Sequence, residues 1–159
     1  FTFFGVENII RIGSAGAICK ELNLRDIIAV QAACTNSNFA AQYSLPGTFA
    51  PAATFSLLQK AVQTAEKQNA PLQVGTVLTS DTFYDDSESA MIWEKMGVLA
   101  VEMETAALYM TAARCKKKAL SLLTVSDRLF DPTEELTAQE RETSLNNMIR
   151  LALDTAVSL

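Results

Sequence analysis

The stretch VLAVEMETAA, residues 98–107, decides the fold of this chain. Its first half is an apolar, β-branched run that predicts a buried strand, and from Thr105 onward the pattern changes to helical spacing. Glu102 and Glu104 lie at this change. Ligands of open α/β sheets bind at this end of the strands, so both carboxylates are candidate ligand contacts that point the same way if the strand continues to Glu104. Alternatively, one of them caps the helix, because acidic residues favour a first helical turn.

The composition indicates a single domain over residues 1–159 with a well-buried core. Hydrophobic residues make up 49% of the chain and charged residues 19%. The net charge is −5 and no basic stripe is visible, which argues against nucleic-acid binding. No apolar run approaches the roughly 20 residues of a membrane span, and no signal peptide is visible, so we expect no membrane partner.

The cysteine and histidine content narrows the possible chemistry. The three cysteines are far apart and lack metal-ligand spacing, which favours a reduced, cytoplasmic protein without a metal site. The chain has no histidine, so a proton-transferring residue must be Asp, Glu, Lys, Tyr or Cys. Residues 1–6 are apolar and have neither a helix cap nor an initiating methionine, so we expect the chain to begin within a larger fold.

The other hydrophobic patterns predict strands that alternate with helices. Buried strands are expected at residues 8–13, 26–30, 72–79 and 118–125, and a long loop at residues 34–51. Helices are expected at residues 52–68, 87–96 and 105–114, and from a capping-box pattern at residues 137–140 onward. The expected buried stripes are Phe55, Leu58, Val62 and Ala65 in the first helix, and Leu145, Met148, Ile149, Ala152 and Ala156 in the last.

Polar residues follow three predicted strands, which end at Gly13, Met103 and Ser126. Such convergence is what an active-site crevice requires. In the first strand, Arg11 lies among isoleucines and needs a negative partner, and the small residues 13–16 predict a turn with backbone N–H groups open to an anion. Arg11 and Ser14 are therefore a candidate phosphate site. The alternative is an arginine–carboxylate pair within the protein followed by an ordinary tight turn.

Two further segments also have both a functional and a structural interpretation. Phe83 and Tyr84, in a polar loop after a strand, either form a wall against a planar ligand or fold back onto the core. Arg141 lies in the first turn of the last predicted helix, where the helix dipole disfavours a positive charge. It therefore either serves a nearby acid of the site or pairs with a surface glutamate.

Several of these segments together resemble the bacterial-type, hexameric purine nucleoside phosphorylases of the nucleoside phosphorylase superfamily. The matching motifs are IIRIGSAGA at residues 9–17, FY at 83–84, VEME at 101–104, TVSD at 124–127 and ER at 140–141. The resemblance implies an α/β domain with a mixed, twisted central sheet flanked by helices. It implies reversible attack of inorganic phosphate on C1′ of a purine nucleoside, which gives the free base and ribose or deoxyribose 1-phosphate. Phosphate is then a co-substrate, no cofactor is needed, and the chain is expected to form a homo-oligomer, a hexamer in the family.

The resemblance also implies which residues bind phosphate and sugar. Arg11 and Ser14 correspond to phosphate ligands, the former through charge-assisted, forked hydrogen bonds. Glu104 corresponds to the residue that binds the ribose hydroxyls, with Met103 beneath the sugar and Glu102 beside it.

At the base, the resemblance places Phe83 against the purine and makes Asp127 the general acid that protonates N7. Ser126 lies next to Asp127, and Arg141 helps to set the position of the proton. These roles suit a transition state with oxocarbenium character. Phosphate and the carboxylates stabilise the positive charge on the sugar, and the acid neutralises the charge growing on the base.

Related families give two alternatives. The hydrolytic methylthioadenosine and S-adenosylhomocysteine nucleosidases share the motifs at 101–104 and 126–127 but usually lack an arginine matching Arg11, which favours phosphorolysis here. Uridine phosphorylases lack the equivalent of Asp127, which favours a purine. In the family, further N-terminal strands and residues lent to a neighbouring subunit's site precede the part matched here. With those strands missing, the other alternative is a non-catalytic remnant that binds a nucleoside or a partner chain.

Overall fold

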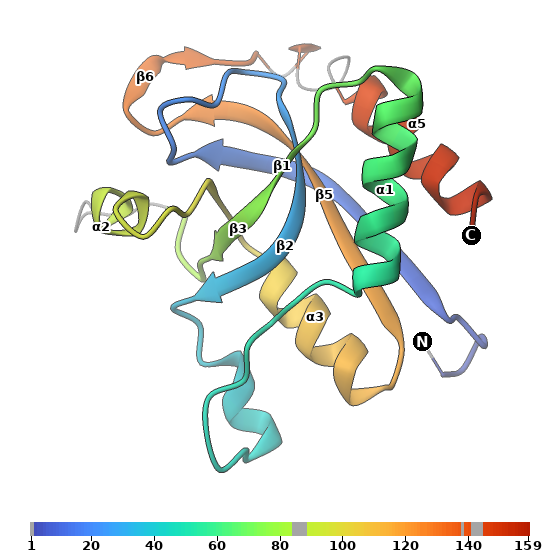
Figure 1. Ribbon diagram of the computed structural model, residues 1–159. Coiled ribbons are helices and arrows are strands. Elements are labelled where there is room, and N and C mark those ends of the chain that lie inside the picture. Colours follow the sequence, from blue (N-terminus) through green and yellow to red (C-terminus); the bar gives the residue numbers. More distant parts are fainter. Residues whose placement is uncertain (1, 84–88, 138, 141–144) are drawn as a thin grey trace.

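The computed structural model describes residues 2–83, 89–137, 139–140 and 145–159, and Figure 1 shows a sheet with helices packed against it. The strands are β1 (Asn8–Ala17), β2 (Ile27–Thr35), β3 (Gln73–Thr79), β4 (Ala100–Glu102), β5 (Lys118–Arg128) and β6 (Asp131–Glu135). The helices of the described part are the 3₁₀ helix η1 (Phe39–Tyr43), α1 (Phe55–Gln68), α2 (Ala90–Glu94), α3 (Thr105–Arg114) and α5 (Asn146–Val157). The predicted α/β class with a mixed sheet is confirmed.

Five of the strands close into a ring. The strand order is β1-β4-β3-β2-β5-β6, and β1 pairs with β5 as well as with β4. The β1–β5, β2–β3 and β3–β4 pairs are parallel, whereas the β1–β4, β2–β5 and β5–β6 pairs are antiparallel. At the closing point, Gly16 of β1 pairs with Val101 on one side and with Asp127 on the other. The ring therefore brings the three predicted polar strand ends together.

Alternate residues of β2 and β5 pack against different helices, as the period of two in a strand requires. Ile28, Val30, Leu123 and Val125 belong to a core cluster with Tyr109 of α3. The intervening residues Ile27, Ala29, Leu120 and Leu122 belong to a second cluster with α1 and α5. Helices α1 and α5 lie side by side in Figure 1 and contact each other. This two-sided burial explains why the strands have nearly continuous apolar sequences.

The predicted helix at residues 52–68 begins later than expected, at Phe55. Ala52 instead forms a bridge with Ala32 of β2, so the backbone there is extended. Phe55 was predicted to be in the buried stripe and is 71% exposed, which is a wrong prediction. The stripe is shifted around the helix to Leu57, Leu58, Ala61, Thr64 and Ala65.

The predicted stripe of the last helix is confirmed in part. Met148 and Ala152 are buried, Leu145 and Ile149 are half-buried, and Ala156 is exposed, contrary to the prediction. Leu151, which was not predicted, is also buried. Upstream, the predicted capping-box contacts are present: the Glu140 N–H donates to Thr137 Oγ1 at 3.2 Å, and the Thr137 N–H donates to the Glu140 carboxylate at 3.0 Å. These contacts hold the Glu140 pKa below its usual value. Arg141 lies outside the described residues.

The predicted turn at residues 13–16 is wrong, because β1 continues to Ala17. Each residue of β1 pairs with β5, and the small side chains permit a close approach there. A Cβ atom at Gly16 would lie 2.5 Å from Cδ1 of Leu129. Strand β5 likewise continues to Arg128, with one unpaired residue, Ser126, at an irregularity in the β1–β5 ladder. Such bulges are common beside functional sites.

Smaller differences concern the connections between elements. The predicted loop at 34–51 contains η1, and α2 is shorter than the predicted helix at 87–96, of which residues 87–88 lie outside the described part. Strand β6 was not predicted. Among the described residues, no helix has the length and apolar character required to cross a membrane.

Candidate active site

A pocket of about 390 Å³ lies where β1, β4 and β5 meet. Pockets of roughly 300–1,000 Å³ are typical of small-molecule sites. The sequence-predicted site residues that line it are Arg11, Ser14, Phe83, Glu102, Met103, Glu104, Ser126 and Asp127. The polar residues of the three predicted segments thus line one pocket, as expected, although β1 and β5 continue beyond their predicted ends. The roles of these residues stay predictions. Two other predicted residues, Tyr84 and Arg141, lie outside the described part of the chain.

Glu102 is the buried carboxylate of the site, with 5% of its surface exposed. It accepts hydrogen bonds from the backbone N–H of Glu104 at 3.0 Å, from the N–H of Thr105 at 2.9 Å and from Thr105 Oγ1 at 2.7 Å. Thr79 Oγ1 of β3 donates to Oε1 of Glu102, whereas the other three donors contact Oε2. The Glu104 and Thr105 donors lie at the N-terminus of α3, whose dipole also favours a negative charge. The helix-capping alternative therefore applies to Glu102.

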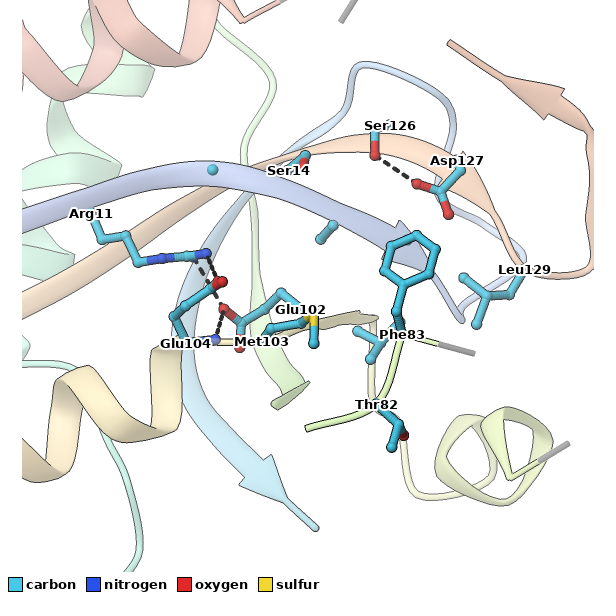
Figure 2. A pocket seen from close by; sticks show the side chains of 14 residues that line it. Arg11, Ser14, Thr82, Phe83, Glu102, Met103, Glu104, Ser126, Asp127 and Leu129 are labelled. Carbon is cyan, nitrogen blue, oxygen red and sulfur yellow. Dashed lines mark hydrogen bonds and ion pairs between the residues drawn. The ribbon is translucent and has the colours of Figure 1, made fainter. Parts of the chain in front are cut away.

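Glu104 has a different environment, although it is only two residues further along the chain. Strand β4 ends at Glu102, and Glu104 is the N-cap residue of α3. The strand therefore does not continue to Glu104, which was the condition for both carboxylates to point the same way from it. The Glu104 side chain is 59% exposed and forms an ion pair with Arg11. In Figure 2 both glutamates nevertheless reach the same guanidinium group, Glu102 from β4 and Glu104 from the start of α3.

Arg11 is held between these two carboxylates. Its Nη1 lies 3.1 Å from Oε2 of Glu102, and its Nη2 donates to Glu104. The guanidinium lies over Gly13, where a Cβ atom would be 3.0 Å from Nη2. A glycine two residues along the same strand thus leaves the space that the arginine occupies. The arginine–carboxylate alternative raised by the sequence is present in the structure, and the phosphate role of Arg11 stays a prediction.

Asp127 lies on the other side of the pocket from Arg11, as Figure 2 shows. Ser126 Oγ donates a hydrogen bond of 2.6 Å to Oδ1 of Asp127. Oδ2 of Asp127 would lie 2.8 Å from a Cβ atom at Gly16, so glycine is the residue that fits beside this carboxylate. Ser126 and Gly16 together fix the orientation of the Asp127 side chain.

Three large apolar side chains line the same pocket. Phe83 is 76% exposed, so it does not fold back onto the core, and it lines the pocket with Met103 and Leu129. Leu129 was missed by the sequence analysis, as were Thr82 and Val101 as lining residues. The position of Leu129, a large apolar residue two positions after Asp127, could have indicated that it lines the pocket. Such a surface suits the face of a planar ring.

The charges of the described lining residues do not balance. One arginine, Arg11, faces the three carboxylates of Glu102, Glu104 and Asp127, which gives a formal net charge of −2. The arrangement can accept hydrogen bonds from hydroxyl groups and transfer a proton through a carboxyl group. Binding of an anion in this pocket requires that Arg11 be released from a carboxylate or that another cation enter the pocket.

The chain is similar to known proteins over nearly its whole length. The model of the Phosphorylase superfamily matches residues 2–158. A DeoD-type purine nucleoside phosphorylase of Geobacillus sp. strain WCH70 is 47% identical over 154 residues, which cover 97% of this chain and 65% of that protein. Its counterpart in Bacillus cereus strain ATCC 14579 is 49% identical over 158 residues, covering 97% of this chain and 66% of that protein. The chain therefore spans slightly less than two thirds of the length of these curated relatives.

Proposed function

Because the chain belongs to the phosphorylase superfamily, we propose that it acts in the reversible phosphorolysis of purine nucleosides, yielding the free base and ribose or deoxyribose 1-phosphate. The observation that best supports this function is the single pocket that joins Arg11 and Glu104 at one side to Asp127 at the other. A nucleoside needs both sides, one for the sugar and its attacking nucleophile and one for the departing base.

At the first side, Arg11 and Ser14 bind inorganic phosphate, the co-substrate, and no other cofactor takes part. Glu104 accepts hydrogen bonds from the ribose hydroxyls, because its carboxylate is exposed to the pocket. Met103 lies beneath the sugar. Glu102 acts beside them mainly by fixing α3 and Arg11, since its oxygens already accept several protein hydrogen bonds. The negative charges on this side stabilise an oxocarbenium-like transition state.

At the second side, Asp127 donates the proton to N7 of the leaving purine. Ser126 binds Oδ1, which leaves Oδ2 as the oxygen that holds the proton. Phe83 and Leu129 supply the apolar surface against the ring. By resemblance, Arg141 helps to set the position of the proton.

We further propose that the protein is a cytoplasmic homo-oligomer, with a hexamer as the family's arrangement, and that residues 1–159 form one phosphorylase-like domain. The free thiols Cys19, Cys34 and Cys115 support a reducing compartment. A neighbouring subunit is one source of the additional cation that the pocket charge calls for.

Hydrolysis is the second candidate function, and one observation favours it. Arg11 is paired with two carboxylates, and a hydrolytic nucleosidase, which activates water, has no need of a free phosphate-binding cation.

The deciding experiment measures the release of hypoxanthine from inosine and of adenine from adenosine, with and without inorganic phosphate. Phosphorolysis requires phosphate and yields ribose 1-phosphate, whereas hydrolysis proceeds without phosphate and yields ribose. Arg11→Gln should raise the apparent Michaelis constant for phosphate far more than that for the nucleoside. Nucleoside binding without turnover under either condition would instead identify a non-catalytic binding chain.

A further inference from the structure

We propose that Glu104 is a displaceable partner of Arg11, so that phosphate and Glu104 compete for one guanidinium group and phosphate binding frees the Glu104 carboxylate for the sugar. This inference rests on the proposed function, because it concerns how phosphate and nucleoside share the same pocket. It couples the two ligands: phosphate opens the Arg11–Glu104 pair and leaves an unpaired carboxylate for the ribose hydroxyls, and these hydroxyls in turn release Arg11 for phosphate.

The two carboxylates on Arg11 differ in the way that this mechanism requires. Glu102 has a side chain that is 1% exposed and accepts hydrogen bonds from Thr79, Glu104 and Thr105. Its position is therefore fixed by groups other than Arg11. Within the described part of the chain, the Glu104 carboxylate contacts only Arg11, through the ion pair, and it is largely exposed. Only Glu104 is free to leave without uncovering a buried charge.

The energy needed to break each ion pair also favours the departure of Glu104 over that of Glu102. An exposed ion pair contributes little net stability, whereas breaking a buried pair by moving one partner away leaves an uncompensated charge. A phosphate dianion offers several acceptor oxygens and about twice the charge of a carboxylate, and its geometry matches the donor fork of arginine. Phosphate should therefore replace Glu104 at Nη2 while the contact between Nη1 and Glu102 persists.

The replacement of Glu104 by phosphate at Arg11 determines whether phosphate and nucleoside favour or oppose each other's binding. Ribose hydroxyls that donate to Glu104 weaken its hold on Arg11 and so favour phosphate. By linkage, phosphate must favour the hydroxyl-bearing sugar by the same factor. Phosphate and nucleoside are thus expected to bind with positive cooperativity.

The test is isothermal titration calorimetry with inorganic phosphate as the probe, on the parent chain and on Glu104→Gln. The variant should bind phosphate about tenfold more tightly, within the roughly 5- to 150-fold range typical of coupling between sites. Asp127→Asn is the matched control, because it also removes one carboxylate from the pocket but none from Arg11, and it should change phosphate affinity less than about twofold. Circular dichroism verifies that each variant is folded.

A second titration uses a purine C-nucleoside, whose carbon–carbon glycosidic bond resists cleavage, and its 2′,3′-dideoxy form. The hydroxyl-bearing compound should tighten phosphate binding to the parent several-fold, and the dideoxy compound should not. Glu104→Gln should abolish this difference.

Three results would each overturn the competition. The parent and Glu104→Gln could bind phosphate with equal affinity, or Asp127→Asn could increase phosphate affinity as much as Glu104→Gln does. The third result is that neither the parent nor Glu104→Gln binds phosphate. Arg11→Gln separates this failure from failure of the proposed function. If phosphate binds the parent and Arg11→Gln equally well, the phosphate role of Arg11 is wrong. If Arg11→Gln loses phosphate while Glu104→Gln resembles the parent, only the competition is wrong.

Discussion

Glu102 and Glu104 show how strongly the surroundings decide what a carboxylate does. Both are glutamates of the same motif and both contact Arg11. Glu102 is covered by the first turn of α3, so its charge is part of the folded core, whereas Glu104 is open to solvent. The same substitution should therefore destabilise the fold much more at Glu102 than at Glu104.

Glu102→Gln should lower the free energy of unfolding by about 3 kcal/mol, because an amide cannot accept all the hydrogen bonds of the buried carboxylate and leaves Arg11 partly uncompensated. Glu104→Gln should change it by less than about 1 kcal/mol, as expected for an exposed pair. Urea denaturation of both variants measures the difference. Equal losses of stability would show that Glu102 is not the structural member of the pair.

Asp127→Asn should lower turnover by about 10²- to 10⁴-fold, the usual contribution of a general acid, with a smaller effect on nucleoside binding. The measurement is phosphate-dependent release of hypoxanthine under conditions where the parent is active. Asp154→Asn, on the exposed side of α5, is the control and should retain parental turnover. An Asp127→Asn variant within about threefold of the parent would exclude the role of general acid.

At the scale of elements, α3 connects the site to the core. Its Tyr109 is buried, donates a hydrogen bond of 2.7 Å to the Val30 carbonyl of β2 and accepts one of 2.9 Å from the Ser121 N–H of β5. Burial raises the pKa of Tyr109, so its hydroxyl stays protonated well into the alkaline range. Glu104 is the N-cap residue of the same helix, and Tyr109 therefore fixes the element that positions Glu104 beside Arg11.

Tyr109→Phe should lower the free energy of unfolding by about 2 kcal/mol, because a buried carbonyl and a buried N–H lose their partner. Tyr43→Phe is the control: its hydroxyl lies 3.4 Å from Thr111 Oγ1 at a partly exposed position, and the change should cost little. The parent should also lose stability above about pH 10, where the tyrosine ionises in the unfolded chain but not in the folded one. Tyr109→Phe should lack this component in a pH series of urea denaturations.

Elements with strong periodic patterns could be predicted from the sequence, and those set by pairing could not. The apolar run of β5 and the helical spacing of α3 are visible in the residues themselves. The Gly-Ser-Ala-Gly segment of β1 has the composition of a turn, and it is a strand because β5 pairs with it through residue 17. Strand β6 is a polar segment with a proline, so only its pairing with β5 makes it a strand.

At the scale of the whole molecule, the sequence could place the site residues in three separate segments of the chain but could not show how those segments meet. That depends on the closed ring, in which Gly16 lies between Val101 and Asp127. The ion pairs on Arg11 were one of two alternatives until the relative positions of β1 and α3 were known, because spacing along the chain says nothing of such distant contacts.

The ring also leaves part of β1 with one open edge. Within the described residues, β1 pairs with β5 over its full length but with β4 only through Gly16 and Ala17. Ile12, on the open part, is 42% exposed. Open strand edges tend to pair with other chains, so these 159 residues should self-associate in solution.

Ile12→Lys should reduce this association, because a charged side chain on an edge strand opposes pairing with another strand. Multi-angle light scattering over a range of concentrations measures the effect. Leu153→Lys adds the same charge to an exposed position of α5 and should leave the mass distribution as in the parent. Equal dissociation by both variants would point to general charge repulsion and not to the strand edge.

Closure of the ring has a consequence for amide hydrogen exchange. Strand β5 lies between β1 and β2 at residues 122–124, and the Ser121 N–H donates to the buried Tyr109 hydroxyl, so these N–H groups reach solvent only when packed elements separate. The backbone of β5 should therefore exchange deuterium only through global opening, with one common free energy of opening, while α2 exchanges through local fluctuations. Mass spectrometry of deuterated peptides should find the slowest amides of the protein at residues 119–125, directly before Ser126 and Asp127. Asp127, the proposed general acid, would thus follow directly the segment of the protein that opens last.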